Sequence, residues 1–185
     1  MKLRGGNALI DSLTFLAHGG IKQGDTIADL GCGATGHFVF PAAHLVGSKG
    51  KVYAVDIQKS VLAAIESRSK LEGVDNVETI WADLERSRAT KLPDGSVELT
   101  LLLNLLAQVQ HKEAVLQEAS RIAKPGSTLI VSDWKMTASP LGPPVERRLD
   151  SRRVLELARA AGFERIEEFE AGPYHFGIVF HKRIP

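Results

Sequence analysis

The chain has 185 residues, of which 44% are hydrophobic and 24% charged, and these are the proportions of one globular domain with its own hydrophobic core. A formal net charge of +1 excludes the strong basic field expected of a protein that binds nucleic acid or a membrane surface. The single cysteine, Cys32, excludes an intramolecular disulfide and favours a reducing, cytoplasmic setting.

Neither a signal peptide nor a membrane span is expected. Asp11 and His18 interrupt the apolar residues at the start of the chain, and no apolar run approaches the roughly 20 residues that a membrane helix needs. The histidines lack partners at metal-ligand spacing, so no metal site is expected. The sequence leaves the oligomeric state open.

The predicted elements alternate between helix and strand along the chain. Apolar residues at helical spacing predict an N-terminal helix over 7–20, ended by Gly19-Gly20. Short apolar runs predict five strands at 26–32, 51–57, 77–83, 97–104 and 127–134. Further helices are expected at 36–47, 60–73, 112–126 and 151–162. The last extended segments, 163–172 and 174–183, are too close for a crossover helix and should pair antiparallel.

This order of β-then-α units followed by a hairpin predicts a doubly wound, mostly parallel α/β fold in one domain. Within it we expect an N-terminal helix in residues 1–24, a nucleotide-binding core in 25–135, and an acceptor-side loop, helix and hairpin in 136–185. Such sheets bind ligands at the carboxyl ends of their strands, where this chain places polar residues after every central strand.

The first strand runs into three glycines with the spacing Gly31-x-Gly33-x-x-Gly36. Gly31 and Gly33 can adopt backbone angles closed to other residues and let a ligand approach the main chain, and Gly36 would let the next helix pack closely. The alternative is a tight turn without a ligand. With a strand before it and a helix after it, the loop favours a nucleotide, either a dinucleotide such as NAD or S-adenosylmethionine (SAM).

Two acidic residues bear on that choice. Asp56 ends the second strand, where its carboxylate could accept hydrogen bonds from both ribose hydroxyls of an adenosine, which either ligand contains. Asp29 lies two residues before the first glycine, where it would repel a pyrophosphate but attract the ammonium and sulfonium groups of SAM. A competing interpretation of Asp29 is a buried acceptor for backbone amides.

The end of the third strand adds an adenine site. Asp83 is placed to accept a hydrogen bond from the adenine amino group, with capping of the segment 84–88 as an alternative. Ile57 would flank the adenine with apolar contact. Trp81 is expected in the core, on the same face as Asp83 but deeper.

The ordered set "DLGCGATG", "VYAVDI", "TIWADLE" and "RIAKPGSTLIVSDW" resembles the class I SAM-dependent methyltransferases. Within them it is similar to the type 11 group related to the ubiquinone and menaquinone C-methyltransferases. The resemblance runs from about Thr26 to Trp134 and continues more loosely to the end. It implies a seven-stranded fold and SAM as the methyl donor, with S-adenosylhomocysteine (SAH) as product.

The resemblance also assigns roles to single positions. Asp29, Gly31 and Gly33 would line the methionine part of SAM, and Asn104 would lie beside the transferring methyl group. The full predicted cofactor site consists of Asp29, Gly31, Cys32, Gly33, Gly36, Asp56, Ile57, Ala82, Asp83, Leu84 and Asn104. Cys32 is given no catalytic role, and a lone cysteine argues against the arsenic-methylating activity of some relatives.

The acceptor side is expected in the late loops. Residues 132–144 leave the fifth strand and could fold over the pocket. Candidate catalytic residues are Asp133, Tyr174 and His175, the last because its pKa range suits proton transfer near neutrality; an exposed loop histidine without a role is the alternative.

Three further residues are predicted to contact the substrate. Trp134 could pack against a flat acceptor or simply belong to the core. Arg148 matches an arginine of small relatives and so faces the predicted pocket. His111 follows the fourth strand, where it could instead begin the next helix.

The predicted function is methyl transfer from SAM to an unidentified small molecule by in-line displacement. Two alternatives remain: a SAM-binding sensor or partner subunit without catalysis, and, less favoured, an NAD-linked oxidoreductase.

Overall fold

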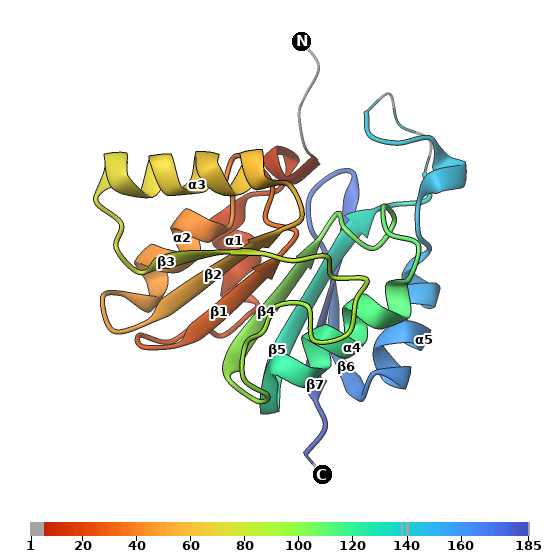
Figure 1. The fold of residues 1–185 in the computed structure, drawn as a ribbon. Helices are drawn as coiled ribbons and strands as arrows, with labels where there is room; N and C mark the ends of the chain where they lie inside the picture. Colours follow the sequence, from red (N-terminus) through yellow and green to blue (C-terminus); the bar gives the residue numbers. More distant parts are fainter. Residues whose placement is uncertain (1–5, 138, 140, 185) are drawn as a thin grey trace.

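A computed structural model describes residues 6–137, 139 and 141–184. Within these residues seven strands form one sheet in the order β3-β2-β1-β4-β5-β7-β6, shown in Figure 1. β7 runs antiparallel to both of its neighbours, and the other pairs are parallel. The strands are β1 (Thr26–Leu30), β2 (Lys51–Asp56), β3 (Val77–Trp81), β4 (Val97–Leu103), β5 (Ala123–Trp134), β6 (Phe163–Glu170) and β7 (His175–Lys182). The doubly wound fold with its terminal hairpin is confirmed.

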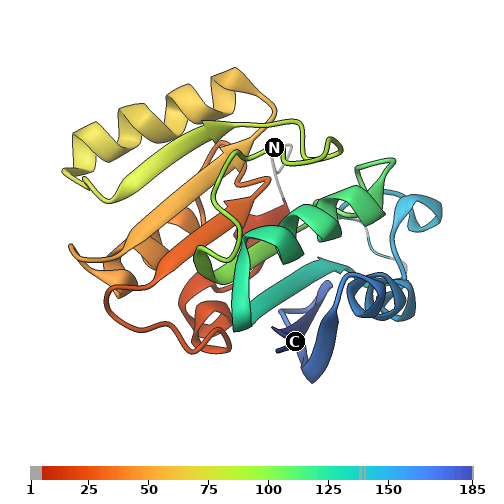
Figure 2. The same cartoon turned by 60° about the horizontal axis from the view of Figure 1, so that its bottom comes forward.

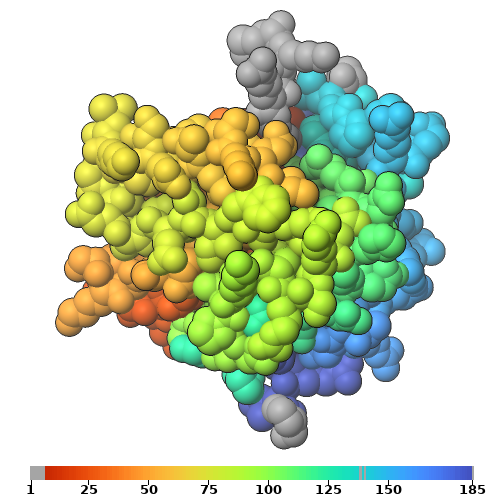
Figure 3. Space-filling view, viewed as in Figure 1, coloured from red at the N-terminus to blue at the C-terminus, as the bar shows by residue number. Residues whose placement is uncertain are grey.

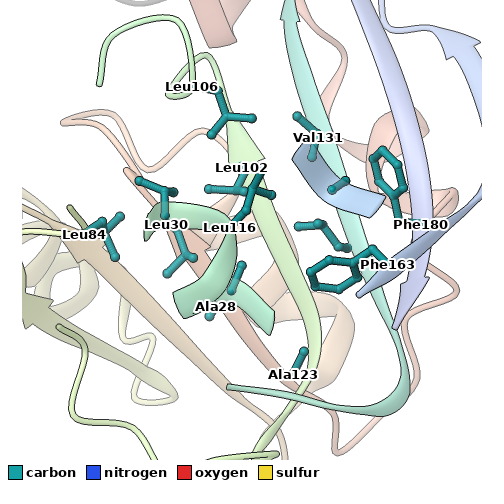
Figure 4. Close-up of a cluster of buried hydrophobic side chains, with 14 of the residues drawn as sticks. Ala28, Leu30, Leu84, Leu102, Leu106, Leu116, Ala123, Val131, Phe163 and Phe180 are labelled. Atoms are coloured by element: carbon teal, nitrogen blue, oxygen red, sulfur yellow. The ribbon is translucent and has the colours of Figure 1, made fainter. Parts of the chain in front are cut away.

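Helices cover both faces of the sheet, as the turned view in Figure 2 shows. One face carries α1 (Ser12–Ala17), α2 (Val39–Val46) and α3 (Lys59–Glu72), whose buried side chains pack with Ile27 and Leu101 of the sheet. The other carries α4 (Lys112–Ile122) and α5 (Ser151–Ala160). Figure 4 shows this second core, where Leu116 of α4 lies over Leu30, Leu102 and Val131. The central strands are therefore buried on both sides, which explains their continuous apolar runs.

The N-terminal helix differs from its prediction. The structure has a short 3₁₀ helix, η1 (Gly6–Leu9), then a break, and only then α1. Asp11 causes the break because its carboxylate caps α1, accepting a hydrogen bond from the backbone N–H of Thr14 at 2.8 Å. Asn7 in the short helix accepts a hydrogen bond from Asn104, which follows β4, so the segment before the break lies beside that strand end.

The prediction for Trp81 was wrong. Its side chain is 55% exposed instead of buried, because β3 is an edge strand of the sheet. The indole N–H donates to the carbonyl of Ile57 at 2.8 Å, and the Lys59 ammonium lies over the ring. Trp81 therefore forms part of the surface beside the end of β2.

The connection from β3 to β4 is fastened to α4 and fills the centre of the face shown in Figure 3. The buried carboxylate of Glu118 accepts hydrogen bonds from the backbone N–H and the hydroxyl of Thr90, at 2.9 and 2.6 Å. Arg121 pairs with the same carboxylate at 2.7 Å. These contacts hold the connection between β3 and β4 in place, although this connection forms no regular helix or strand.

The register of the parallel strands brings their carboxyl ends to one edge. Asp29 of β1 lies beside Ala54 of β2 and Leu101 of β4, so the residues that follow these strands emerge together. In Figure 1 this edge faces the loop after β5 and the start of the described chain. No helix in the described ranges is long and apolar enough to span a bilayer.

Candidate functional site

The glycine loop between β1 and α2 uses its own N–H groups for internal hydrogen bonds. Those of Gly31 and Cys32 both donate to the carbonyl of Val55, at 2.8 and 3.0 Å. That of Gly33 donates to the Asp56 carboxylate at 3.2 Å. A loop that binds a pyrophosphate presents such N–H groups to the ligand, whereas these three are already occupied. The geometry therefore disfavours a dinucleotide.

The three glycines differ in what surrounds them. Each has a positive φ, but a Cβ atom at Gly36 would lie 2.6 Å from the Phe40 ring and 2.7 Å from Ile65. Gly36 therefore permits close approach of Phe40 of α2 and Ile65 of α3 to the glycine loop. A Cβ at Gly33 would meet no atom within 4 Å, so space lies open above this turn. At Gly31 the space is taken by the Leu105 side chain.

Asp29, at the end of β1, is buried. Its side chain is 1% exposed, and neither carboxylate oxygen has a hydrogen-bond partner among the described residues. Burial, with a smaller contribution from the negative charge of Asp56, raises the pKa of Asp29 to about 7. A buried carboxylate without a donor is costly, and a neighbouring cation would relieve that cost.

Asp56 and Asp83 lie next to one another along the edge. Asp56 is buried and also accepts from the backbone N–H of Gln58 at 2.9 Å, and its own carbonyl accepts from Ala82 at 3.1 Å. Asp83 is half-buried and accepts from the N–H of Glu85 at 3.2 Å and from Arg86 at 3.0 Å. These contacts support the capping interpretation of Asp83, and the adenine-binding interpretation stays a prediction.

The remaining predicted cofactor residues divide into buried and exposed ones. Cys32, Ala82 and Leu84 are buried, and burial raises the pKa of the Cys32 thiol, so this thiol stays protonated. Ile57 is 53% exposed, which leaves its side chain free to contact a ligand.

Asn104 follows β4 in a left-handed backbone conformation, with φ of 53°. Asparagine is one of the few residues with a side chain that adopts it readily. Its N–H donates to the carbonyl of Ser132 at 2.8 Å, and its carbonyl accepts from the side chain of Gln108. Its side-chain Nδ2 donates to Oδ1 of Asn7 at 2.7 Å, while its own Oδ1 is buried without a partner in the described chain.

Buried polar atoms without partners gather at this edge. Within the described ranges nine such side-chain atoms occur, and six belong to Asp29, Asn104, Ser132 and His175. These residues lie at or near the ends of β1, β4, β5 and the start of β7. Because native proteins satisfy nearly all buried polar groups with protein, water or ligand partners, such a concentration indicates a candidate ligand site.

Ser132 was not predicted from the sequence. It sits beside Gly177 of β7 and Leu103 of β4 in the sheet register. The only signal in the sequence is a small hydroxyl residue at the end of the apolar run "LIVSDW". That signal is weak because serines in strands usually have no ligand.

His175 is fully buried, at 0% exposure, and not on the exposed loop that the alternative interpretation placed it on. The antiparallel register pairs it with Trp134, and the two rings lie 4.2 Å apart. Burial, together with the charges of Lys135 and Arg148, lowers the pKa of His175 to about 4. The imidazole is therefore neutral near pH 7. Tyr174 is half-buried, with its ring 6.4 Å from that of Trp134.

Asp133 and Arg148 both form hydrogen bonds with backbone groups around the site. The Asp133 carboxylate accepts from the N–H groups of Ala107 and Trp134, at 3.2 and 2.8 Å, and burial raises the pKa of Asp133 to about 6. The buried Arg148 guanidinium donates to the carbonyls of Pro143, Lys135, Thr137 and Leu141. It also lies 5.4 Å from the Trp134 ring. These contacts favour positioning roles for both residues.

Trp134 and His111 lie at opposite extremes of exposure. Trp134 is buried, and a Cβ at Gly142 would come within 2.6 Å of its ring, so the loop after β5 packs tightly on it. His111 is exposed at the N-cap of α4, where its backbone N–H donates to Glu85 at 2.6 Å. Its position agrees with the interpretation as a helix start.

No three His, Cys, Asp or Glu side chains of the described chain gather as metal ligands.

Comparison with known proteins agrees with this geometry. A family model described as a methyltransferase domain matches residues 21–166. The ubiquinone/menaquinone biosynthesis C-methyltransferase UbiE of Pseudomonas fluorescens is 32% identical over 123 residues, which are 66% of this chain and 46% of that protein. UbiE of Escherichia fergusonii is 31% identical over 135 residues, 71% of this chain and 50% of that protein. The chain thus spans about half the length of the curated relatives it matches.

Among solved structures, a SAM-dependent methyltransferase from Aquifex aeolicus shares this fold with a TM-score of 0.85 at 29% sequence identity. The alignment covers 94% of this chain and 90% of the Aquifex chain. The similarity therefore extends over nearly the whole of both chains.

Proposed function

The chain belongs to the class I SAM-dependent methyltransferases, and on that premise we propose that it methylates a small molecule held at the carboxyl edge of its sheet. The observation that carries this proposal is the group of partnerless buried polar atoms on Asp29, Asn104, Ser132 and His175. Such atoms are stabilised when donors or cations of a bound ligand reach them.

The residues present fit SAM. Asp29 is an acid without a partner in the described chain, and it lies just before the glycine turn, where Gly33 has free space above it. An acid at this place favours the cationic ammonium and sulfonium groups. We assign Asp56 to the ribose hydroxyls and Asp83 to the adenine amino group. Asp56 keeps the glycine turn in shape at the same time, through its hydrogen bond from Gly33.

SAM supplies an electrophilic methyl group on its positively charged sulfur. What the protein must add is alignment of the acceptor behind that methyl group and exclusion of water. Proximity and orientation of this kind can lower a barrier by roughly 7–11 kcal/mol. Asn104, held in its left-handed conformation at the end of β4, is assigned to the methyl position.

The acceptor is assigned to the side of the site formed by residues 136–185 together with Trp134. A neutral imidazole such as that of His175 can accept a hydrogen bond from an acceptor's O–H or N–H. With a pKa of about 4, His175 is a weak base, so its proposed role is to orient the acceptor. Full removal of a proton is needed only for acceptors that must lose one.

Titration calorimetry tests the cofactor assignment. We expect SAM and SAH to bind and NAD to produce no heat of binding. Binding of NAD without a response to either sulfur compound would refute the proposal.

Transfer of a labelled methyl group to small phenols, amines and quinol precursors then tests catalysis. Activity with at least one acceptor is expected, and His175→Asn should lower kcat while leaving the SAM affinity within about twofold. Tight SAM binding with no transfer to any acceptor would instead support a non-catalytic SAM sensor.

A further inference from the structure

The N-terminal segment 7–10, which we call the strap, is attached to the site at several points. Oδ1 of Asn7 accepts the hydrogen bond from Asn104 at 2.7 Å, across 97 residues of sequence. At the other end, the carbonyl of Ile10 is 2.7 Å from Nε2 of His37, the residue that follows the glycine loop. A Cβ at Gly172, in the turn before β7, would lie 3.0 Å from the carbonyl of Leu9. The strap thus lies against Asn104 after β4, His37 after the glycine loop and the turn before β7.

The hydrogen bond between Asn7 and Asn104 fixes the orientation of the Asn104 carboxamide as well as its distance from Asn7. The backbone of Asn104 is already held on both sides, by Ser132 and by Gln108. Its carboxamide carries an NH₂ donor at one end and an oxygen acceptor at the other. Since Asn7 engages the donor, the acceptor Oδ1 is the end left without a partner among the described residues, and it is buried.

The polarity of that end matters for a cationic ligand. An amide oxygen attracts positive charge, whereas an NH₂ group in the same place repels it. If Asn104 were free to rotate its carboxamide, half of the possible orientations would present the wrong end. Asn7 presents its Oδ1 to Asn104, and an oxygen that only accepts selects the orientation in which Nδ2 of Asn104 faces Asn7 and its Oδ1 faces away.

We propose that Asn7 is a positioning residue of the SAM site, which holds Oδ1 of Asn104 toward the cationic part of SAM. This inference rests on the proposed function and extends the site to a segment of the chain that the sequence motifs do not include. Asn7 acts through Asn104 and touches no reacting atom.

Calorimetric titration of SAM into matched variants tests the inference. Asn7→Ala should weaken SAM binding by about fivefold, the effect of losing one orienting hydrogen bond. Asn7→Asp should bind within about twofold of the wild type, because a carboxylate still accepts from Nδ2 of Asn104. Ala8→Ser is the control, since Ala8 is the exposed neighbour in the strap, and it should leave the affinity unchanged.

A double-mutant cycle separates orientation of Asn104 from general support by the strap. If Asn7 acts through Asn104, Asn7→Ala should cause no further loss in an Asn104→Ala protein. An equal fivefold loss in that background, or unchanged affinity in Asn7→Ala alone, would overturn the inference. Thermal unfolding of each variant verifies that it is folded. A wild-type protein that fails to bind SAM would refute the proposed function instead, so the two failures are distinguishable.

Discussion

The carboxylate of Asp56, at the end of β2, accepts a hydrogen bond from the backbone N–H of Gly33 at 3.2 Å. The acid from the second strand therefore holds the turn that follows the first. This single contact joins the two parts of the proposed adenosyl site, the open glycine turn and the ribose acceptor.

Asp56→Ala should weaken SAM binding by more than about tenfold, because it removes a charged acceptor and leaves the Gly33 N–H without its partner. Calorimetry measures the affinity, with Asp75→Ala as the control because Asp75 is exposed in the turn between α3 and β3. Equal affinities of the wild type and Asp56→Ala would show that the ribose lies elsewhere.

Asp29 should lower the stability of the folded protein at neutral pH. Its pKa is raised from the model-peptide value of 3.8 to about 7, so the folded state holds a proton that the unfolded state has released. Stability is therefore lost as the pH rises from about 4 to 7 and stays low above that range.

Asp29→Asn should remove this loss and stabilise the protein by about 2–4 kcal/mol at pH 7.5, but very little at pH 4. Urea unfolding at the two pH values provides the comparison. If Asp29→Asn stabilised the protein equally at pH 4 and pH 7.5, the titration of Asp29 would not be the cause of the stabilisation.

The two glycines Gly33 and Gly36 should respond differently to alanine. Gly36→Ala places a Cβ against Phe40 and Ile65, so we expect a loss of about 2–3 kcal/mol in unfolding free energy. Gly33→Ala meets open space and should lose only about 1 kcal/mol from its positive φ. Its SAM affinity should fall nonetheless, since the methyl group enters the space assigned to the ligand. Denaturant unfolding combined with calorimetry checks both; the reverse order of stabilities would contradict the packing argument.

Arg148 should determine the order of the loop after β5. Lysine cannot reproduce a guanidinium that donates to four carbonyls, so Arg148→Lys should speed hydrogen exchange in this loop and cost about 1–3 kcal/mol of stability. The neighbouring Arg147 is exposed, and Arg147→Lys serves as the control. Unchanged exchange in Arg148→Lys would show that the loop is held by other contacts.

Much of the fold could be predicted because local signals agree with it. The glycine spacing, the apolar runs of β1 and β4, and Gly73 at the end of α3 each indicate an element boundary, and Gly73 is indeed left-handed. The order of polar strand ends was sufficient to indicate the edge at which we propose the site. These features depend on residues close together in the chain.

Contacts between distant segments were not predictable in the same way. The burial of His175 follows from its register with Trp134, and the exposure of Trp81 follows from the edge position of β3. Neither alternation nor composition encodes which strand lies at an edge. The Asn7–Asn104 contact likewise depends on a break at Asp11 that redirects the N-terminal segment.

We propose that the carboxyl edge of this sheet binds a cation and that the carboxylate of Asp29 supplies the negative charge beside it. The proton that Asp29 carries in the free protein must then leave when SAM binds. The most direct test is calorimetry of SAM binding at pH 7 in buffers of different ionisation enthalpy, which counts released protons. With a pKa of about 7, Asp29 should contribute about half a proton per SAM bound. Asp29→Asn provides the reference for proton changes that do not involve Asp29. A wild-type release about half a proton larger than that of Asp29→Asn supports the account, and equal release in the two proteins would contradict it.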